Sequence, residues 1–223
     1  MNWMALELSL KLAAWTTLLL LPIGIFMSRF LAWRTFRGKI FVEAGLALPL
    51  VLPPTVLGFY LLVAMGGGSP IGQFYEALIG RSLVFSFDGL VVASVIFNLP
   101  FAIQPMQRAF EGISAEVREA AACCGLSRWR ILWRIELPLA WPGILSALVL
   151  TFAHTIGEFG IVLMVGGNIP GETQTIAIAI YDQVQIFDNA SAGLMSVVLL
   201  MISMLAISAT YLSASFVGRR HDG

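Results

Sequence analysis

Long apolar runs alternate with short polar connections along this chain, and five of the runs are long enough to cross a lipid bilayer. About 20 consecutive apolar residues in a helix span the hydrocarbon core. The third run is the shortest and contains Pro100 and Pro105. We predict an all-α, polytopic membrane helix bundle with about five transmembrane helices. The predicted spans are Leu8–Met27, Ala44–Met65, Leu90–Met106, Pro142–Val165 and Gly193–Val217.

No internal repeat or low-complexity linker divides the chain, so residues 1–223 are predicted to form a single transmembrane domain. Its longest polar connection covers about residues 107–141. Composition agrees with the membrane class, because the 223 residues are 58% hydrophobic and 12% charged. Soluble domains are about half apolar and about a quarter charged.

The basic residues predict the orientation, since cytoplasmic connections carry an excess of lysine and arginine. Only Lys11 and Arg81 fall on the opposite side from the rest. We therefore expect the amino terminus outside and the carboxyl terminus in the cytoplasm. The first run lacks a basic flank before it, so we expect a retained helix and not a cleaved signal. The eleven basic residues on the predicted cytoplasmic side are Arg29, Arg34, Arg37, Lys39, Arg108, Arg118, Arg128, Arg130, Arg134, Arg219 and Arg220.

The second run contains three prolines within residues 48–55, and each removes an intrahelical hydrogen bond. Broken membrane helices often mark transport pathways. A packed kink is an equal alternative, and both can hold, because Gly58 beside the kink would let two helices approach closely.

The polar connection holds Glu119-Ala120-Ala121, with Gly125 four residues on. Alanine favours helix, and glycine can adopt the left-handed conformation that ends one. We predict a short helix that ends at Gly125, with Leu126 projecting from the turn and Ser127 capping the next helix. Proline-containing pairs at Leu137-Pro138 and Trp141-Pro142 are expected to end that element and start the fourth span.

This ordered set, Glu119-Ala120-Ala121, Gly125 and Ile135-x-Leu137-Pro138, resembles the loop by which permease subunits of ATP-driven (ABC) importers dock onto their ATPase. The resemblance implies a type I importer permease fold, with ATP hydrolysis on a separate chain, no enzymatic activity and no cofactor in this one. Glu119 is expected to orient the loop through hydrogen bonds. The implied ATPase-docking residues are Glu119, Ala120, Ala121, Gly125, Leu126, Ile135, Leu137 and Pro138.

Three further stretches resemble the molybdate-importer permease: residues 48–54, 157–160 and 168–175. The family implies a homodimer in the bacterial inner membrane, two cytoplasmic ATPase subunits, and an external oxyanion-binding protein. Its surroundings would be membrane lipid, with no nucleic-acid partner. Tungstate and sulfate permeases share this architecture, so they are alternatives for the substrate.

No lysine or arginine lies at mid-depth in the predicted spans. Conduction needs contacts weak enough for the ion to leave, so a neutral, hydrated path suits an oxyanion. Alternatively, the hydroxyl groups bond back to their own helices. Glu158 is expected to have a structural or gating role in preference to substrate contact, because a carboxylate would repel an anion. The candidate pathway or gate residues are Pro53, Pro54, Thr55, Thr151, Thr155 and Glu158.

His154 lies four residues before Glu158, a spacing that puts both on one helix face. A metal site or a membrane enzyme is a weaker alternative, because no further metal ligand or nucleophile–base set accompanies the pair. A channel or secondary transporter, which needs no ATPase, is a third alternative. Cys123 and Cys124 are adjacent and on the reducing side, so we expect packing residues and no disulfide.

Overall fold

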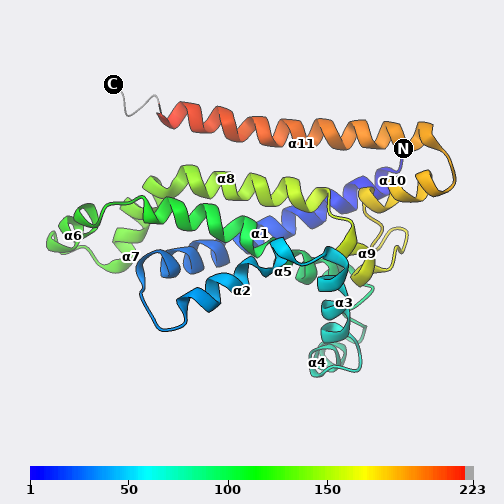
Figure 1. Cartoon of the computed structure of the whole chain (residues 1–223), viewed down its shortest axis with the longest axis horizontal. Helices are drawn as coiled ribbons and strands as arrows, with labels where there is room; N and C mark the ends of the chain where they lie inside the picture. Colours follow the sequence, from blue (N-terminus) through cyan, green and yellow to red (C-terminus); the bar gives the residue numbers. More distant parts are fainter. Residues whose placement is uncertain (219–223) are drawn as a thin grey trace.

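The computed structural model describes the backbone of residues 1–218 and the side chains of residues 1–208, and the described chain is built from helices (Figure 1). Within it, four helices are long and apolar enough to cross a membrane, or up to five if one bent pair counts as a single span. The elements in chain order are α1 (Trp3–Trp33), α2 (Lys39–Val51), α3 (Pro54–Met65), α4 (Pro70–Ile79), α5 (Phe87–Glu111), α6 (Ala115–Cys123), α7 (Arg128–Ile131), the π-helix η1 (Leu132–Glu136), α8 (Leu137–Ile156), α9 (Gly160–Gly166), α10 (Ile176–Gln185) and α11 (Asn189–Gly218).

The centre of the bundle is formed by α1, α5 and α8, which pack against one another, while α11 lies along α8 at the outside (Figure 1). Small residues permit the close approach. A Cβ atom placed on Gly143 of α8 would clash with the side chain of Ala109 on α5 and lie 3.0 Å from the Pro105 carbonyl oxygen. Without water between them, membrane helices associate through such close packing.

The second predicted span is broken: α2 and α3 are joined at Leu52 and Pro53 with a bend of 113°. Pro53 and Pro54 lack the N–H groups that would continue the α2 hydrogen-bond ladder, and Pro54 begins α3. The predicted break is therefore confirmed. So is the close approach at Gly58, where an added Cβ would lie 2.8 Å from the Met164 Cβ on α9.

The bounds predicted for the fourth span are wrong at both ends. A continuous helix runs from Arg128 to Ile156, and the chain then breaks before the separate helix α9. Pro138 does not end a helix, because the π-helix precedes it: the Leu137 N–H already bonds to the Leu132 carbonyl, five residues back. A π turn widens the ladder, which gives the proline ring room.

The other spans are longer than predicted, with bounds Trp3–Trp33, Phe87–Glu111 and Asn189–Gly218. A span predicted from an apolar run ends at the first polar residues. The helices themselves continue through polar residues to their caps. At the start of α5, for example, Ser86 Oγ accepts a hydrogen bond from the Gly89 N–H at 3.2 Å. Pro100 and Pro105 lie inside this helix without ending it.

The two ends of the bundle differ in charge. The amino terminus lies at one end, where the Asn2 amide donates to Gln174 at 3.1 Å, and α6 and α7 lie at the other (Figure 1). Lys11 and Arg81 share one cavity with Glu172, at the amino-terminal end. Arginines from α1, α6 and α7 gather at the opposite end. Arg219 and Arg220 lie outside the described residues.

Candidate functional site

The predicted short helix of the polar connection is α6, and it ends as predicted. Gly125 has φ +75°. Its N–H bonds to the Ala122 carbonyl at 3.0 Å, and the Leu126 N–H bonds to the Ala121 carbonyl at 3.3 Å. This pair of hydrogen bonds is a Schellman motif, which satisfies the last carbonyls of the helix. Ser127 then caps α7 through its Oγ atom, which accepts from the Arg130 N–H at 3.4 Å.

The implied docking residues are divided between the surface and the interior of this loop. Ala121 is buried, while Leu126, Ile135 and Leu137 are half-buried. The packing role predicted for Cys123 and Cys124 is wrong within the single chain, because both are free and exposed at the end of α6. The docking residues that remain fully exposed are Glu119, Ala120, Gly125 and Pro138.

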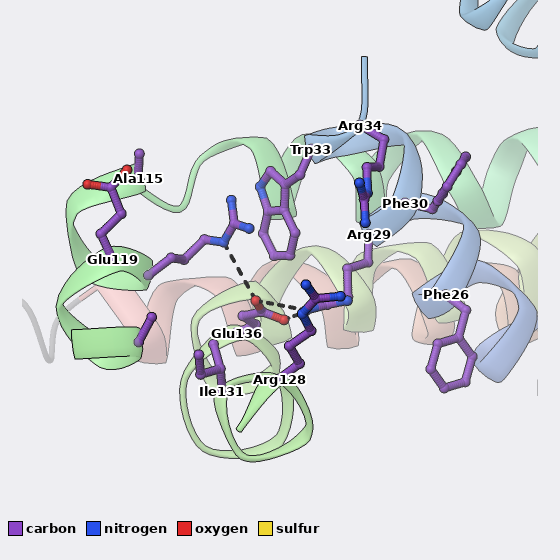
Figure 2. A pocket seen from close by; sticks show the side chains of 12 residues that line it. Phe26, Arg29, Phe30, Trp33, Arg34, Ala115, Glu119, Arg128, Ile131 and Glu136 are labelled. Atoms are coloured by element: carbon purple, nitrogen blue, oxygen red, sulfur yellow. Dashed lines mark hydrogen bonds and ion pairs between the residues drawn. The ribbon is translucent and has the colours of Figure 1, made fainter. Parts of the chain in front are cut away.

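A buried ion pair that the sequence analysis missed holds this loop to the bundle. Glu136, at the end of the π-helix, is 1% exposed. The Arg29 Nε of α1 donates to Glu136 Oε2 at 2.6 Å, and a second nitrogen of Arg29 donates to Oε1 at 3.2 Å. The Arg118 Nε of α6 lies 3.6 Å from the same carboxylate. Figure 2 shows Glu136 beside Arg29, with dashed lines marking its ion pairs.

Trp33 of α1 completes the cluster. The Arg118 guanidinium carbon lies 3.6 Å from the centroid of the Trp33 ring, and that of Arg29 lies 5.2 Å away. Stacking of a guanidinium on an indole adds to the ion pair. Three separate elements, α1, α6 and the π-helix, are thus joined around one carboxylate.

Glu136 occupies the variable position of the Ile135-x-Leu137-Pro138 motif. A carboxylate flanked by apolar residues, in an otherwise basic segment, is the sequence signal that would have found it. The side chain of Glu119, by contrast, makes no hydrogen bond or ion pair with any residue the structure describes. Hydrogen bonds that orient the loop were predicted for Glu119. Within the described chain, Glu136 makes contacts of this kind, with Arg29 and Arg118.

A cavity of about 680 Å³ opens beside this cluster (Figure 2). Four arginines and three aromatic rings line it, from α1, α6 and α7. Its lining residues are Phe26, Arg29, Phe30, Trp33, Arg34, Ala115, Arg118, Glu119, Ala122, Arg128, Ile131 and Glu136.

A second buried polar cluster lies where α8 breaks. The Ser94 hydroxyl of α5 donates to Glu158 Oε2 at 3.2 Å, and the Asn98 amide donates to the Ser94 carbonyl at 2.9 Å. Asn98 Oδ1 lies 3.0 Å from His154 Nδ1, and that imidazole stacks on Phe101 with ring centroids 4.0 Å apart. These contacts fix the end of α8 against α5.

The predicted relation between His154 and Glu158 is wrong. Because α8 ends at Ile156, Glu158 lies in the break before α9 and shares no helix face with His154. Among the described residues, no group of three or more histidine, cysteine, aspartate or glutamate side chains is arranged to hold a metal ion.

Four of the six candidate pathway residues, Pro53, Pro54, Thr55 and Glu158, lie at two helix breaks that meet. A Cβ placed on Gly160, just after the α8–α9 break, would lie 2.8 Å from the Pro54 Cβ at the α2–α3 break. Pro54 and its neighbours Pro53 and Thr55 are exposed on the surface of the single chain. Breaks in membrane helices leave backbone groups free to face a water-filled path.

The two candidate threonines of α8 are buried. The Thr155 hydroxyl donates to the Thr151 carbonyl at 2.8 Å, so for this residue the alternative of bonding back to its own helix is correct. The Thr151 hydroxyl is buried without a hydrogen-bond partner among the described residues.

Residues 21–221 match the family described as binding-protein-dependent transport system inner membrane component. A protein named molybdenum transport system permease protein ModB from Azotobacter vinelandii is 47% identical over 212 residues, 95% of this chain and 94% of that protein. The protein of that name from Escherichia coli (strain K12) is 40% identical over 208 residues, 92% of this chain and 91% of its own length.

Solved structures support the fold. A chain of a bacterial ABC transporter involved in the import of the acidic polysaccharide alginate superposes with a TM-score of 0.72, over 93% of this chain and 78% of that chain. Its sequence identity is 18%, so this likeness concerns the architecture alone.

Proposed function

Since this chain belongs to the family of binding-protein-dependent transport system inner membrane components, we propose that it is the permease subunit of an ATP-driven molybdate importer. The observation that supports molybdate as the substrate is the 47% identity to a molybdenum permease over almost the whole of both chains. The chain is a transport subunit, with ATP hydrolysis on a separate partner. It is a multi-pass membrane protein.

The amino terminus is placed outside the cell and α6 in the cytoplasm. Segregation of the basic residues supports this orientation, because arginines from α1, α6 and α7 gather at the end of the bundle that carries α6. The ATPase then docks on the exposed surface of α6 and its Gly125 turn. Glu136 transmits the movement, since its carboxylate joins α6 to α1 and to the continuous helix that becomes α8.

The working assembly is a homodimer with two ATPase subunits and an external oxyanion-binding protein. The exposure of Pro53, Pro54 and Thr55 supports an interface with a second copy of the chain. Backbone at a helix break must be shielded from lipid, either by protein or by a water-filled path. The anion path runs along the meeting point of the two breaks. Residues 1–223 act as one transmembrane domain in this assembly, with residues 107–141 as the coupling loop.

The experiment that tests this function is reconstitution with the cognate binding protein and ATPase. We expect molybdate and tungstate, delivered by the binding protein, to stimulate ATP hydrolysis and anion uptake. Stimulation by sulfate alone would overturn the substrate. Uptake without an ATPase would support a channel or secondary transporter, and turnover of a substrate by this chain alone would support a membrane enzyme.

Replacing Gly125 with valine is expected to uncouple ATP hydrolysis from uptake. A β-branched residue in the left-handed conformation costs about 1–2 kcal/mol, which lowers the population of the formed turn about five- to thirtyfold. Uptake per ATP hydrolysed in proteoliposomes measures the effect. Gly125→Asn is the matched control, because asparagine tolerates this conformation. Equal coupling in both variants would contradict the docking role of the turn.

Glu158 is proposed to hold the α8–α9 break against α5, with no contact to the anion. Glu158→Gln keeps an acceptor for the Ser94 hydroxyl, so we expect near-normal uptake. Glu158→Leu leaves that hydroxyl unpaired at a cost of about 1–3 kcal/mol, and we expect a lower thermal unfolding midpoint and reduced uptake. If glutamine abolished uptake while stability was unchanged, the charge itself would be required and the structural role would be wrong.

A further inference from the structure

The cavity beside Glu136 carries positive charge that the chain does not neutralise. Arg29 and Arg118 are paired with Glu136. Arg34 at the end of α1 and Arg128 at the start of α7 also line the cavity, and neither side chain has a hydrogen bond or ion pair with a described residue. Figure 2 shows both arginines around the same space.

An apolar strip on α1 leads from this cavity along the helix. Ile23, Phe26 and Phe30 follow one another at spacings of three and four residues, so they share one helix face. All three are exposed, at 37%, 50% and 52%. Trp129 of α7 packs edge-on against Phe26, with ring centroids 6.1 Å apart. Aromatic rings next to arginines are typical of the boundary between hydrocarbon and headgroups.

We propose that this cavity binds the phosphate headgroup of an anionic phospholipid. Arg34 and Arg128 contact the phosphate, and an acyl chain lies along Ile23, Phe26 and Phe30. Charge complementarity selects an anion, because four arginines and two glutamates line the space. The adjoining apolar strip selects a lipid over a free ion. Basic pockets between membrane helices are known to bind such headgroups.

Occupancy would affect the docking loop. Arg34 directly follows α1 and Arg128 begins α7, so one phosphate bridges the two elements that flank the Arg29–Glu136 ion pair. The lipid therefore adds a second connection between the loop and the bundle, next to the one made by Glu136. This inference does not depend on which oxyanion is transported.

The test measures lipid binding to the complete transporter, purified in detergent with its ATPase. Native mass spectrometry with added phosphatidylglycerol, phosphatidylcholine or inorganic phosphate gives the three affinities. We expect preferential binding of phosphatidylglycerol. An interfacial arginine contributes about fivefold to such binding, so Arg34→Gln with Arg128→Gln should weaken it about thirtyfold.

Arg130→Gln with Arg134→Gln is the matched control. It removes the same charge, at exposed arginines that do not line the cavity. An equal loss in this control, or equal affinity for phosphatidylcholine, would overturn the site. Tight binding of inorganic phosphate alone would identify a site for a free anion, and would overturn the proposal that the occupant is a lipid. No lipid binding to the assembled complex would also overturn the lipid site.

A salt titration of the unaltered transporter keeps the proposal falsifiable if the double variant fails to fold. Raising the ionic strength screens exposed charges, so the affinity for phosphatidylglycerol should fall while that for phosphatidylcholine stays constant. An affinity for phosphatidylglycerol that is independent of salt would overturn the role of Arg34 and Arg128.

Discussion

Replacing Glu136 with glutamine is expected to destabilise the protein by about 2–3 kcal/mol and to abolish most of its ATP-driven uptake. Removing one member of a buried ion pair costs about 3–5 kcal/mol, because the remaining charge stays buried without its partner. Here the two arginine side chains keep about a third of their exposure, 29% and 31%, which reduces the cost. The thermal unfolding midpoint in detergent and uptake in proteoliposomes are the two measurements.

Glu119→Gln is the control for this prediction. Glu119 is exposed and unpaired within the described residues, so its replacement should leave the unfolding midpoint unchanged and affect ATPase docking alone. Arg29→Gln should reproduce the loss seen in Glu136→Gln, and the double variant should be less unstable than the sum of the two. Strict additivity of the two changes would show that the ion pair contributes nothing to stability.

The second large effect is expected from Gly143→Leu. Gly143 of α8 faces Ala109 and the Pro105 carbonyl of α5 without room for a side chain. Overpacking of a dense interior usually costs about 1–3 kcal/mol, and here the obstacle is partly backbone, which cannot rotate away. We expect the upper end of this range, low yields of folded protein and a lower unfolding midpoint. Gly143→Ala should show the same effect to a smaller degree.

The matched control is Gly193→Leu in α11, where an added Cβ meets nothing within 4 Å. Size-exclusion profiles and unfolding midpoints of the two leucine variants should differ clearly. Equal stability of both would mean that α5 and α8 do not approach as closely as described.

The all-helical membrane bundle, with four or up to five spans, and the shape of the polar loop could be predicted from the sequence, since both depend on local signals. Apolar run length marks the spans, and the Gly125 turn follows from the need for a left-handed residue at the end of α6. The end of the fourth span could not be found this way. Residues 157–160 are flanked by apolar sequence on both sides, so the hydropathy of the run hides the break.

The polar clusters escaped prediction for a different reason. Arg29 and Glu136 are 107 residues apart in the chain, and Ser94 and Glu158 are 64 apart. No spacing rule joins residues on different helices, whereas the i to i+4 rule wrongly joined His154 to Glu158. Each pairing is decided by which helices pack together, and that depends on close contacts such as the one between Gly143 and α5.

The π-helix between α7 and α8 has a mechanical consequence. Because it lets the helix continue past Pro138, the 29 residues from Arg128 to Ile156 form one continuous helical rod about 40 Å long. Torque applied at its Arg128 end, where the ATPase is proposed to dock, is expected to reach the Ile156 end along one helix. The first break on that route is Gly157, directly before Glu158 and the crossing of the two helix breaks, so we expect the twist of the rod to reach the proposed anion path there.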